Sequence, residues 1–225
     1  MTTGKHINAE FDAELGSLKG QILAMGNLVD RHVSEAVAAL VERDLKRAER
    51  VVEADRAVNQ LELAVDEQCV RVLALEQPEA SDLRFVAAAL KMVTDLERIG
   101  DLAVNMAQRV PALSDGPPLR AMEDLPGMAA AAQRMLRDVL DAFVSNDSNK
   151  AEQIRTADAA IDAWTVRILD EVQSVMSRDP SSIARGLGTI LFAKHIERLA
   201  DHVTNIAEMI IYLVCGRDVR HTNVR

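Results

Sequence analysis

Aromatic side chains are scarce in this chain of 225 residues, where one Trp, one Tyr and four Phe amount to 3%. Ala, Leu, Val and Met supply most of the apolar mass, which favours packed helices over sheets. No run of 18 apolar residues occurs, so we expect no transmembrane segment. Residues 1–14 also lack the apolar core of a secretory signal, and the expected compartment is therefore cytoplasmic.

Basic residues are outnumbered, with 26 Lys and Arg against 35 Asp and Glu and a formal net charge of -9. Such a surface repels phosphate backbones, so nucleic acid is not an expected partner. The two cysteines, Cys69 and Cys215, lack the spacing of a metal site. We expect both to be buried free thiols in a reducing compartment.

Prolines occur at three places only: position 78, the stretch 111–127 and position 180. A proline inside a helix removes a hydrogen bond and clashes with the preceding turn, so these places indicate the ends of helices. The stretch 111–127 holds four of the six prolines and is the one linker-like segment of the chain. It separates an N-terminal bundle, 1–112, from a C-terminal bundle, 113–225. The predicted fold is all-α, with two tandem, pseudo-symmetric, antiparallel three-helix bundles. The expected helices cover residues 8–42, 44–76, 81–109, 121–145, 148–178 and 181–215.

The two halves repeat in sequence. Residues 97–107 align with 197–207, and Glu, Arg, Asp, Asn and Ala recur at the same places in the two stretches. Upstream, Ala54-Asp55 matches Ala157-Asp158. A duplicated bundle explains both alignments.

Carboxylates recur at helical spacing in each half. Glu97 and Asp101 are four residues apart and share one face of a helix, as do Glu197 and Asp201. The preceding helix of each half carries a similar pair, so that oxygen atoms from two antiparallel helices can surround a cation. The candidate metal ligands are Asp55, Asn59, Glu97, Asp101, Asp158, Asp162, Glu197 and Asp201. Carboxylate and amide oxygens suit hard ions such as Mg²⁺, Ca²⁺, Mn²⁺ or iron.

Other interpretations of these carboxylates stay open at this point. They could simply solvate a helical adaptor, or they could serve a metal-storage or metal-buffering protein. His195, His202, Asn105 and Asn205 lie near the predicted ridges as further possible ligands. Catalysis is not supported, because the chain has no Glu-x-x-His pair, no Walker-type phosphate loop and no G-x-S-x-G elbow.

Nearly the whole chain resembles the PhoU family of phosphate-signalling proteins. The stretches that carry the resemblance are QPEASDLR at 77–84, DLERIGD at 95–101, HIERLADHVTNIAE at 195–208 and YLVCGRDVRH at 212–221. The resemblance implies a PhoU-like, spectrin-repeat-like fold of two three-helix bundles. It also implies multinuclear metal centres on the bundle surfaces, at positions that match Asp55, Glu97 and Asp101 in one half and Asp158, Asp162, Glu197 and Asp201 in the other.

One position departs from the family pattern, because Asn59 stands where the second half has Asp162. We expect the first site to bind metal less tightly or to hold fewer ions. The resemblance further implies a negative regulator of phosphate signalling and uptake. Its expected partners are the ATPase subunit of the phosphate ABC transporter, a phosphate-sensing histidine kinase and a second copy in a homodimer.

Overall fold

The chain is all-helical in the computed structural model, which describes residues 3–75 and 80–220, with side chains from residue 11 to 74 and from 80 onward. No strand occurs in these two ranges. The first half contains α1 (Thr3–Glu42), α2 (Leu45–Ala54), α3 (Arg56–Leu75) and α4 (Ala80–Ser114). The second half contains η1 (Arg120–Asp124), α5 (Leu125–Ser145), α6 (Ser148–Arg155), α7 (Ala159–Arg178), η2 (Pro180–Ser182) and α8 (Ile183–Cys215).

The turn after the first long helix of each half, between α1 and α2 and between α5 and α6, is built in the same way. Arg43 and Asn146 adopt left-handed backbone conformations, with φ of 54° and 51°, and each is followed by an Asp. The side chain of Asp44 accepts a hydrogen bond from Arg47 N at 3.0 Å, and that of Asp147 accepts one from Lys150 N at 3.0 Å. These N-caps satisfy amide groups that have no partner within the helix, and they fix the starts of α2 and α6.

The predicted uninterrupted helices 44–76 and 148–178 are wrong, because each is divided in two. The break lies at Asp55 in the first half and at residues 156–158 in the second. The Asp55 carbonyl accepts hydrogen bonds from Val58 N at 2.9 Å and Asn59 N at 3.2 Å. The Asp158 carbonyl likewise accepts from Ile161 N and Asp162 N. Each break therefore sets an Asp at the start of a new helix.

The helix that we expected to end at residue 109 continues through Pro111 to Ser114. Proline removes one backbone hydrogen bond, but burial of the last turn offsets this loss. Leu113 is buried in that turn, and a Cβ at Gly188 of α8 would lie 2.8 Å from Leu113 Cδ2. The linker is thus shorter than the proline pattern predicted.

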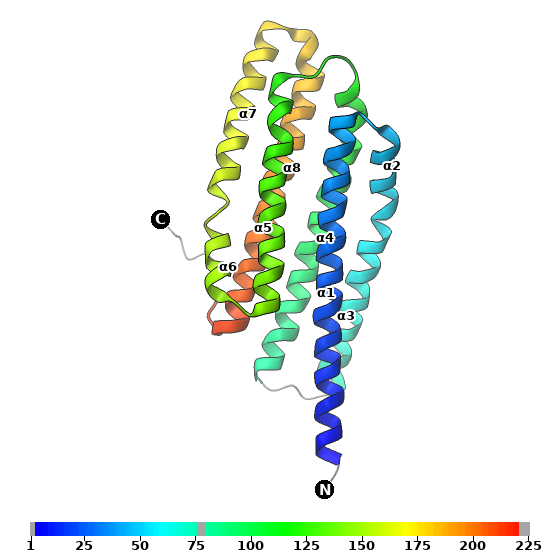
Figure 1. Cartoon of the computed structure of the whole chain (residues 1–225), viewed down its shortest axis with the longest axis vertical. Helices are drawn as coiled ribbons and strands as arrows, with labels where there is room; N and C mark the ends of the chain where they lie inside the picture. The colour runs from blue at the N-terminus through cyan, green and yellow to red at the C-terminus, as the bar shows by residue number, and fades with distance from the viewer. Residues whose placement is uncertain (1–2, 76–79, 221–225) are drawn as a thin grey trace.

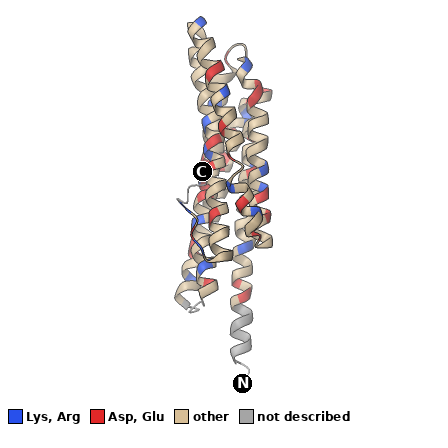
Figure 2. Cartoon of the chain, turned by 90° about the vertical axis from the view of Figure 1, so that its left-hand side faces the viewer, with Lys and Arg blue, Asp and Glu red and all other residues tan. Residues whose placement is uncertain are grey.

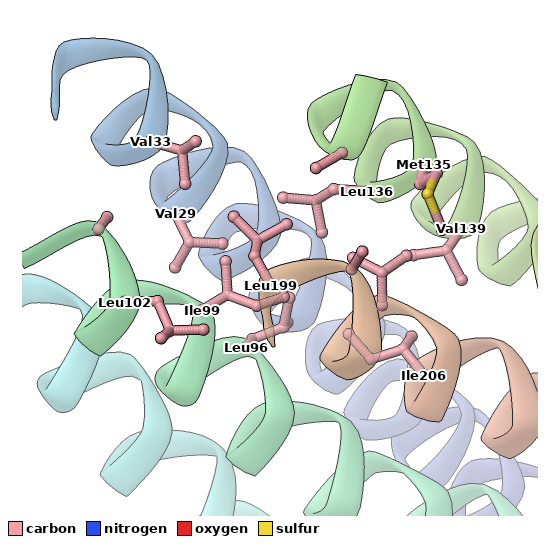
Figure 3. Close-up of a cluster of buried hydrophobic side chains, with 14 of the residues drawn as sticks. Val29, Val33, Leu96, Ile99, Leu102, Met135, Leu136, Val139, Leu199 and Ile206 are labelled. Carbon is pink, nitrogen blue, oxygen red and sulfur yellow. The ribbon is translucent and has the colours of Figure 1, made fainter. Parts of the chain in front are cut away.

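The helices form two antiparallel bundles that lie side by side, with α1 and α5 in front of α4 and α8 (Figure 1). The short helices α2 and α6 lie on opposite edges of the molecule, each continued by the next helix in the chain. This arrangement confirms the predicted fold class. Residues of both halves join in one hydrophobic core, to which α1, α4, α5 and α8 contribute Val29, Val33, Leu96, Ile99, Leu102, Met135, Leu136, Val139, Leu199 and Ile206 (Figure 3).

The longest contact between the halves runs along α4 and α8, which pack antiparallel and which we call the seam. At one end a Cβ on Gly216 would lie 4.0 Å from Arg84 Nε. Midway, Asn205 Nδ2 donates a hydrogen bond to Asp95 Oδ1 at 3.1 Å. Leu113 and Gly188 meet at the other end. The division into domains 1–112 and 113–225 stays a prediction. The predicted boundary falls within the last turn of α4.

Acidic and basic residues are interspersed along the whole length of the side formed by α6 and α7 (Figure 2). Within the described ranges, no helix is both long enough and apolar enough to cross a membrane.

Cys69 is a buried free thiol, as expected. The prediction for Cys215 is wrong, because this free cysteine is exposed. It is the last residue of α8, where the core face of the helix has ended.

Candidate metal centres

The first candidate site lies where the bend between α2 and α3 packs against α4. Asp55 occupies the bend, and Glu97 and Asp101 lie on α4. A Cβ on Gly100 would approach Asp55 Oδ1 to 3.4 Å and Val58 Cγ1 to 3.2 Å. The missing side chain of Gly100 therefore lets the bend approach α4 closely. We call the set Asp55, Asn59, Glu62, Glu97 and Asp101 the first groove.

The carboxylates of the first groove act on one another electrostatically. Partial burial raises the pKa of Glu97, and repulsion from Asp101 raises it further. Partial burial likewise raises the pKa of Asp55, with a smaller contribution from Asp101. Both effects disfavour the ionised form, and a cation bound among these oxygens would reverse both. The sequence prediction that residues 55, 97 and 101 come together is consistent with these shifts.

Glu62 joins this groove, although it was not among the candidate ligands. Burial raises the pKa of Glu62, followed by repulsion from Asp66, and Asp101 also contributes. Glu62 in turn raises the pKa of Glu97. The signal was present in the sequence, because position 62 lies seven residues, or two helical turns, after Asp55.

The second groove lies where α7 begins against α8 and holds Asp158, Asp162, Glu197 and Asp201. Burial raises the pKa of Asp162, and the charges of Asp158 and Glu197 raise it further. Burial also raises the pKa of Asp201, with repulsion from Glu197 and Asp162 next in order. All four predicted residues therefore lie within one another's electrostatic field.

The two grooves hold the same number of carboxylates in different places. By the alignment of Asp55 with Asp158, Asn59 corresponds to Asp162 and Glu62 corresponds to Thr165. The Thr165 hydroxyl is buried and donates to Ile161 O at 3.3 Å. One acidic group is thus displaced by one helical turn between the repeats. The expected weakness of the first site stays a prediction, and the structure adds Glu62 to the carboxylates near it.

Neighbouring side chains hold several of these carboxylates. Arg98 Nε lies 3.4 Å from Glu97 Oε2, and Arg98 Nη1 lies 3.1 Å from Asp101 Oδ2. In the second groove Lys194 Nζ forms an ion pair with Glu197. In the described ranges, no group of three or more acidic, His or Cys side chains is arranged to hold a metal ion. A cation bound at either site would compete with Arg98 and Lys194 for Glu97, Asp101 and Glu197.

The donor set nevertheless fits a hard cation. Asp55 Oδ1 is a buried carboxylate oxygen that accepts no hydrogen bond from any described residue, and Glu97 Oε2 has an ion pair with Arg98 but no hydrogen bond. An unsatisfied buried acceptor costs free energy, and an ion would satisfy it. Oxygen ligands of this kind favour Mg²⁺, Ca²⁺, Mn²⁺ or iron.

The histidine and asparagine candidates in the second half face the seam. His202 Nδ1 lies 2.8 Å from Asp95 Oδ1, and Asn205 donates to the same oxygen at 3.1 Å. Burial lowers the pKa of His195, and the positive charges of Arg109 and Arg198 lower it further. The contacts of His202 and Asn205 with Asp95 tie α8 to α4, a role that helical spacing alone did not distinguish from metal binding. Asn105 makes no hydrogen bond with a described residue of the first groove.

Comparison with known proteins agrees with this architecture. The family model of the PhoU domain matches residues 22–110 and again 125–210. The chain is 42% identical over 221 residues to the phosphate-specific transport system accessory protein PhoU homolog of Pseudomonas putida, covering 98% of this chain and 86% of the relative. It is 37% identical to the accessory protein PhoU of Escherichia coli strain K12, covering 98% and 92%.

Two solved structures share the fold. The crystal structure of PhoU from Pseudomonas aeruginosa superposes with a TM-score of 0.88 at 40% identity, covering 92% of this chain and 100% of that chain. The crystal structure of the phosphate transport system regulatory protein PhoU from Streptococcus pneumoniae gives a TM-score of 0.87 at 35% identity, covering 93% and 99%. The repeated helical bundles, the repeated acidic grooves and these matches have one explanation: the chain belongs to the PhoU family.

Proposed function

We propose that this protein is an accessory protein of phosphate-specific transport that negatively regulates phosphate signalling and uptake. In this role it binds the ATPase subunit of the phosphate ABC transporter and a phosphate-sensing histidine kinase, and it works as a homodimer. It acts as a cytoplasmic adaptor that reaches the membrane through these partners, and it catalyses no reaction. The names of its relatives support the connection to phosphate transport.

The observation that carries the proposal is the repeated acidic groove, which lies on opposite edges of one shared hydrophobic core. Each groove combines a helix start with a long helix of the seam, and each holds four carboxylates. A hard cation in each groove would replace the ion pairs to Arg98 and Lys194 and would reduce the negative charge of that edge. The two edges would then present metal-dependent surfaces to two different partners.

A deletion strain tests the regulatory role directly. We expect loss of the gene to switch on a phosphate-starvation reporter in phosphate-rich medium, and the wild-type gene to restore repression. A variant with Asp55→Asn, Glu97→Gln, Asp158→Asn and Glu197→Gln should be present at wild-type levels and should fail to restore repression. Normal repression in the deletion strain would refute the proposed role.

Pull-down experiments separate the metal from the adaptor role. The purified protein should capture the transporter ATPase subunit and the kinase, and a chelator should weaken at least one of these contacts. Binding that is unchanged after chelation would remove the metal from the mechanism while keeping the adaptor. Elemental analysis that finds metal, in a protein whose deletion leaves phosphate signalling intact, would instead support a metal-storage protein.

A further inference from the structure

The helix α1 lies on the inner side of the first groove. It packs against α2 and α3 as well as against α4. A Cβ on Gly100 would lie 3.5 Å from Val29 Cγ1 of α1 and 3.4 Å from Asp55 Oδ1, so α1 and the bend approach the same point of α4. His32 follows Val29 by three residues and therefore shares its face of α1. This face of α1 thus places a histidine beside the bend that carries Asp55.

The second repeat supports this placement of His32. The N-caps of α2 and α6 align α1 with α5, and at the same offset His32 corresponds to Met135. Met135 lines one cavity with Ala157, the residue directly before Asp158. The position that is equivalent to His32 therefore faces the break at which the first aspartate of the second groove lies.

The imidazole of His32 has an unused nitrogen. His32 is only 5% exposed, and its Nδ1 is buried and forms no hydrogen bond with a described residue. Asp55 Oδ1 is in the same condition, because Asn59 donates its hydrogen bond to the other oxygen of that carboxylate. Burial lowers the pKa of His32, and the charge of Asp55 partly opposes this shift. A buried nitrogen and a buried oxygen, each without a partner, thus lie on the inner side of the groove.

We infer that His32 is a ligand of the first groove and that its nitrogen makes this groove a site for a borderline transition-metal ion such as Zn²⁺ or Fe²⁺. These ions accept imidazole nitrogen together with carboxylate oxygen, whereas oxygen ligands alone suit Mg²⁺, Ca²⁺ and Mn²⁺. In the second groove the equivalent side chain is the thioether of Met135, a soft ligand that none of these ions prefers. The two grooves should therefore select different metals.

This inference rests on the proposed binding of metal by the grooves, to which it adds a ligand and a selectivity. Calorimetric titration of the metal-free full chain with Zn²⁺ and, separately, with Mn²⁺ tests it. The variant His32→Met carries the residue of the second repeat. We expect it to weaken Zn²⁺ binding at one site by at least about tenfold, since the loss of even an outer-shell partner of a metal ligand has an effect of this size.

The comparison of the two ions separates a ligand from a structural residue. The Mn²⁺ affinities of His32→Met should stay within about threefold of those of the wild type, because Mn²⁺ is held by the carboxylates. A general distortion of the groove would weaken both ions alike, and this result would overturn the inference. Circular dichroism checks that the variant is folded.

A reciprocal variant and a control locate the effect. Met135→His should strengthen Zn²⁺ binding at the second groove, and this test does not depend on the stability of His32→Met. The matched control is His202→Gln, because it also removes an imidazole, but one that contacts Asp95 on the seam. The site that His32→Met weakens should keep its wild-type Zn²⁺ affinity in this control.

The possible failures of the two proposals are distinguishable. If the wild type binds Zn²⁺ and Mn²⁺ in both grooves, and a folded His32→Met variant keeps its Zn²⁺ affinity, then His32 is not a ligand and the proposed metal binding still stands. If the wild-type chain binds neither ion, both proposals are wrong.

Discussion

Asn59 Nδ2 donates a hydrogen bond to Asp55 Oδ2 across 3.1 Å, one turn along the first groove. The equivalent pair in the second groove, Asp158 and Asp162, consists of two carboxylates, and their repulsion contributes to the raised pKa of Asp162. In the first half, the amide of Asn59 therefore forms a hydrogen bond with the Asp55 carboxylate. In the second half, the equivalent positions carry two carboxylates that repel each other. This difference predicts unequal behaviour of the two grooves toward a cation.

The first prediction concerns the equivalent positions 59 and 162, where Asn and Asp can be exchanged. Asn59→Asp should tighten Mn²⁺ binding in the first groove and lower the stability of the metal-free protein by a few tenths of a kcal/mol, as like charges four residues apart do. Asp162→Asn should weaken binding in the second groove and have the opposite effect on stability. Calorimetric titration with Mn²⁺ measures the affinities, and two equal sites in the wild type would contradict the prediction.

The second prediction concerns Arg98, which competes with a cation for Glu97 and Asp101. Arg98→Gln should raise the Mn²⁺ affinity of the first groove by about tenfold or less, since exposed ion pairs contribute roughly 0–1 kcal/mol. Arg167→Gln is a suitable control, because Arg167 pairs with Asp124 outside both grooves. Unchanged affinity in Arg98→Gln would show that the arginine does not compete.

The third prediction follows from the raised pKa of Glu97. A carboxyl whose pKa is raised on folding destabilises the native state at neutral pH, and this penalty fades as pH falls toward the reference value of 4.5. In the presence of a chelator, Glu97→Gln should therefore stabilise the protein at neutral pH by roughly 0.5 kcal/mol, the size of a surface charge interaction. Its advantage should vanish near the reference pKa.

Urea unfolding of both proteins across this pH range measures the effect. The comparison cancels other titrating groups that the two proteins share, including His32, whose pKa is lowered by burial. With saturating Mn²⁺ the order should reverse, and the wild type should become the more stable protein. An advantage for Glu97→Gln that persists at low pH would be inconsistent with the predicted shift.

The fourth prediction concerns the two thiols. Burial raises the pKa of Cys69 to about 11, whereas Cys215 is exposed. Only thiolates react with disulfide reagents, so one thiol should react quickly and one slowly in the native protein at about pH 8. Cys215→Ser should remove the fast phase, and denaturant should make Cys69 reactive. Two fast thiols in the native protein would contradict the burial of Cys69.

The fifth prediction concerns the core at the seam, where Ile99 and Leu199 are fully buried in equivalent positions (Figure 3). Ile99→Ala and Leu199→Ala should each lower the free energy of unfolding by about 2–5 kcal/mol, through lost burial and the cavity left behind. Chemical unfolding should show one transition in each variant, because both side chains belong to one core. A separate early transition of one half would indicate that the halves unfold independently.

The fold could be predicted from the sequence because helical periodicity and proline placement extend over long segments. The breaks at Asp55 and at residues 156–158 could not be predicted, since no proline or glycine marks them. At Pro111 the sequence predicted a helix end that the structure does not have. Burial of Leu113 against Gly188 keeps the last turn of α4 helical beyond this proline. Tertiary packing decided these local features.

The candidate site was predictable to the extent that it depends on helix faces. Residues four apart on one helix must share a face, so the pairs on α4 and α8 followed from spacing. Glu62 was noted on the same helix but not counted as a ligand, because its place beside Glu97 depends on how α3 lies against α4. Likewise, His202 could be assigned to Asp95 only from the antiparallel register of the seam, which joins residues 107 positions apart.

The antiparallel seam has a consequence for the evolution of the chain. The side of α4 that covers α8 is apolar over much of its length, so each repeat has a face that only the other repeat shields from water. A sequence change on this face of one repeat must therefore remain compatible with the other repeat. A chimaera that takes its two repeats from different relatives should fold only if Leu113 still packs against Gly188 and Asp95 still bonds to Asn205. Because both halves contribute to one core, neither bundle can lose its partner without exposing apolar side chains to water.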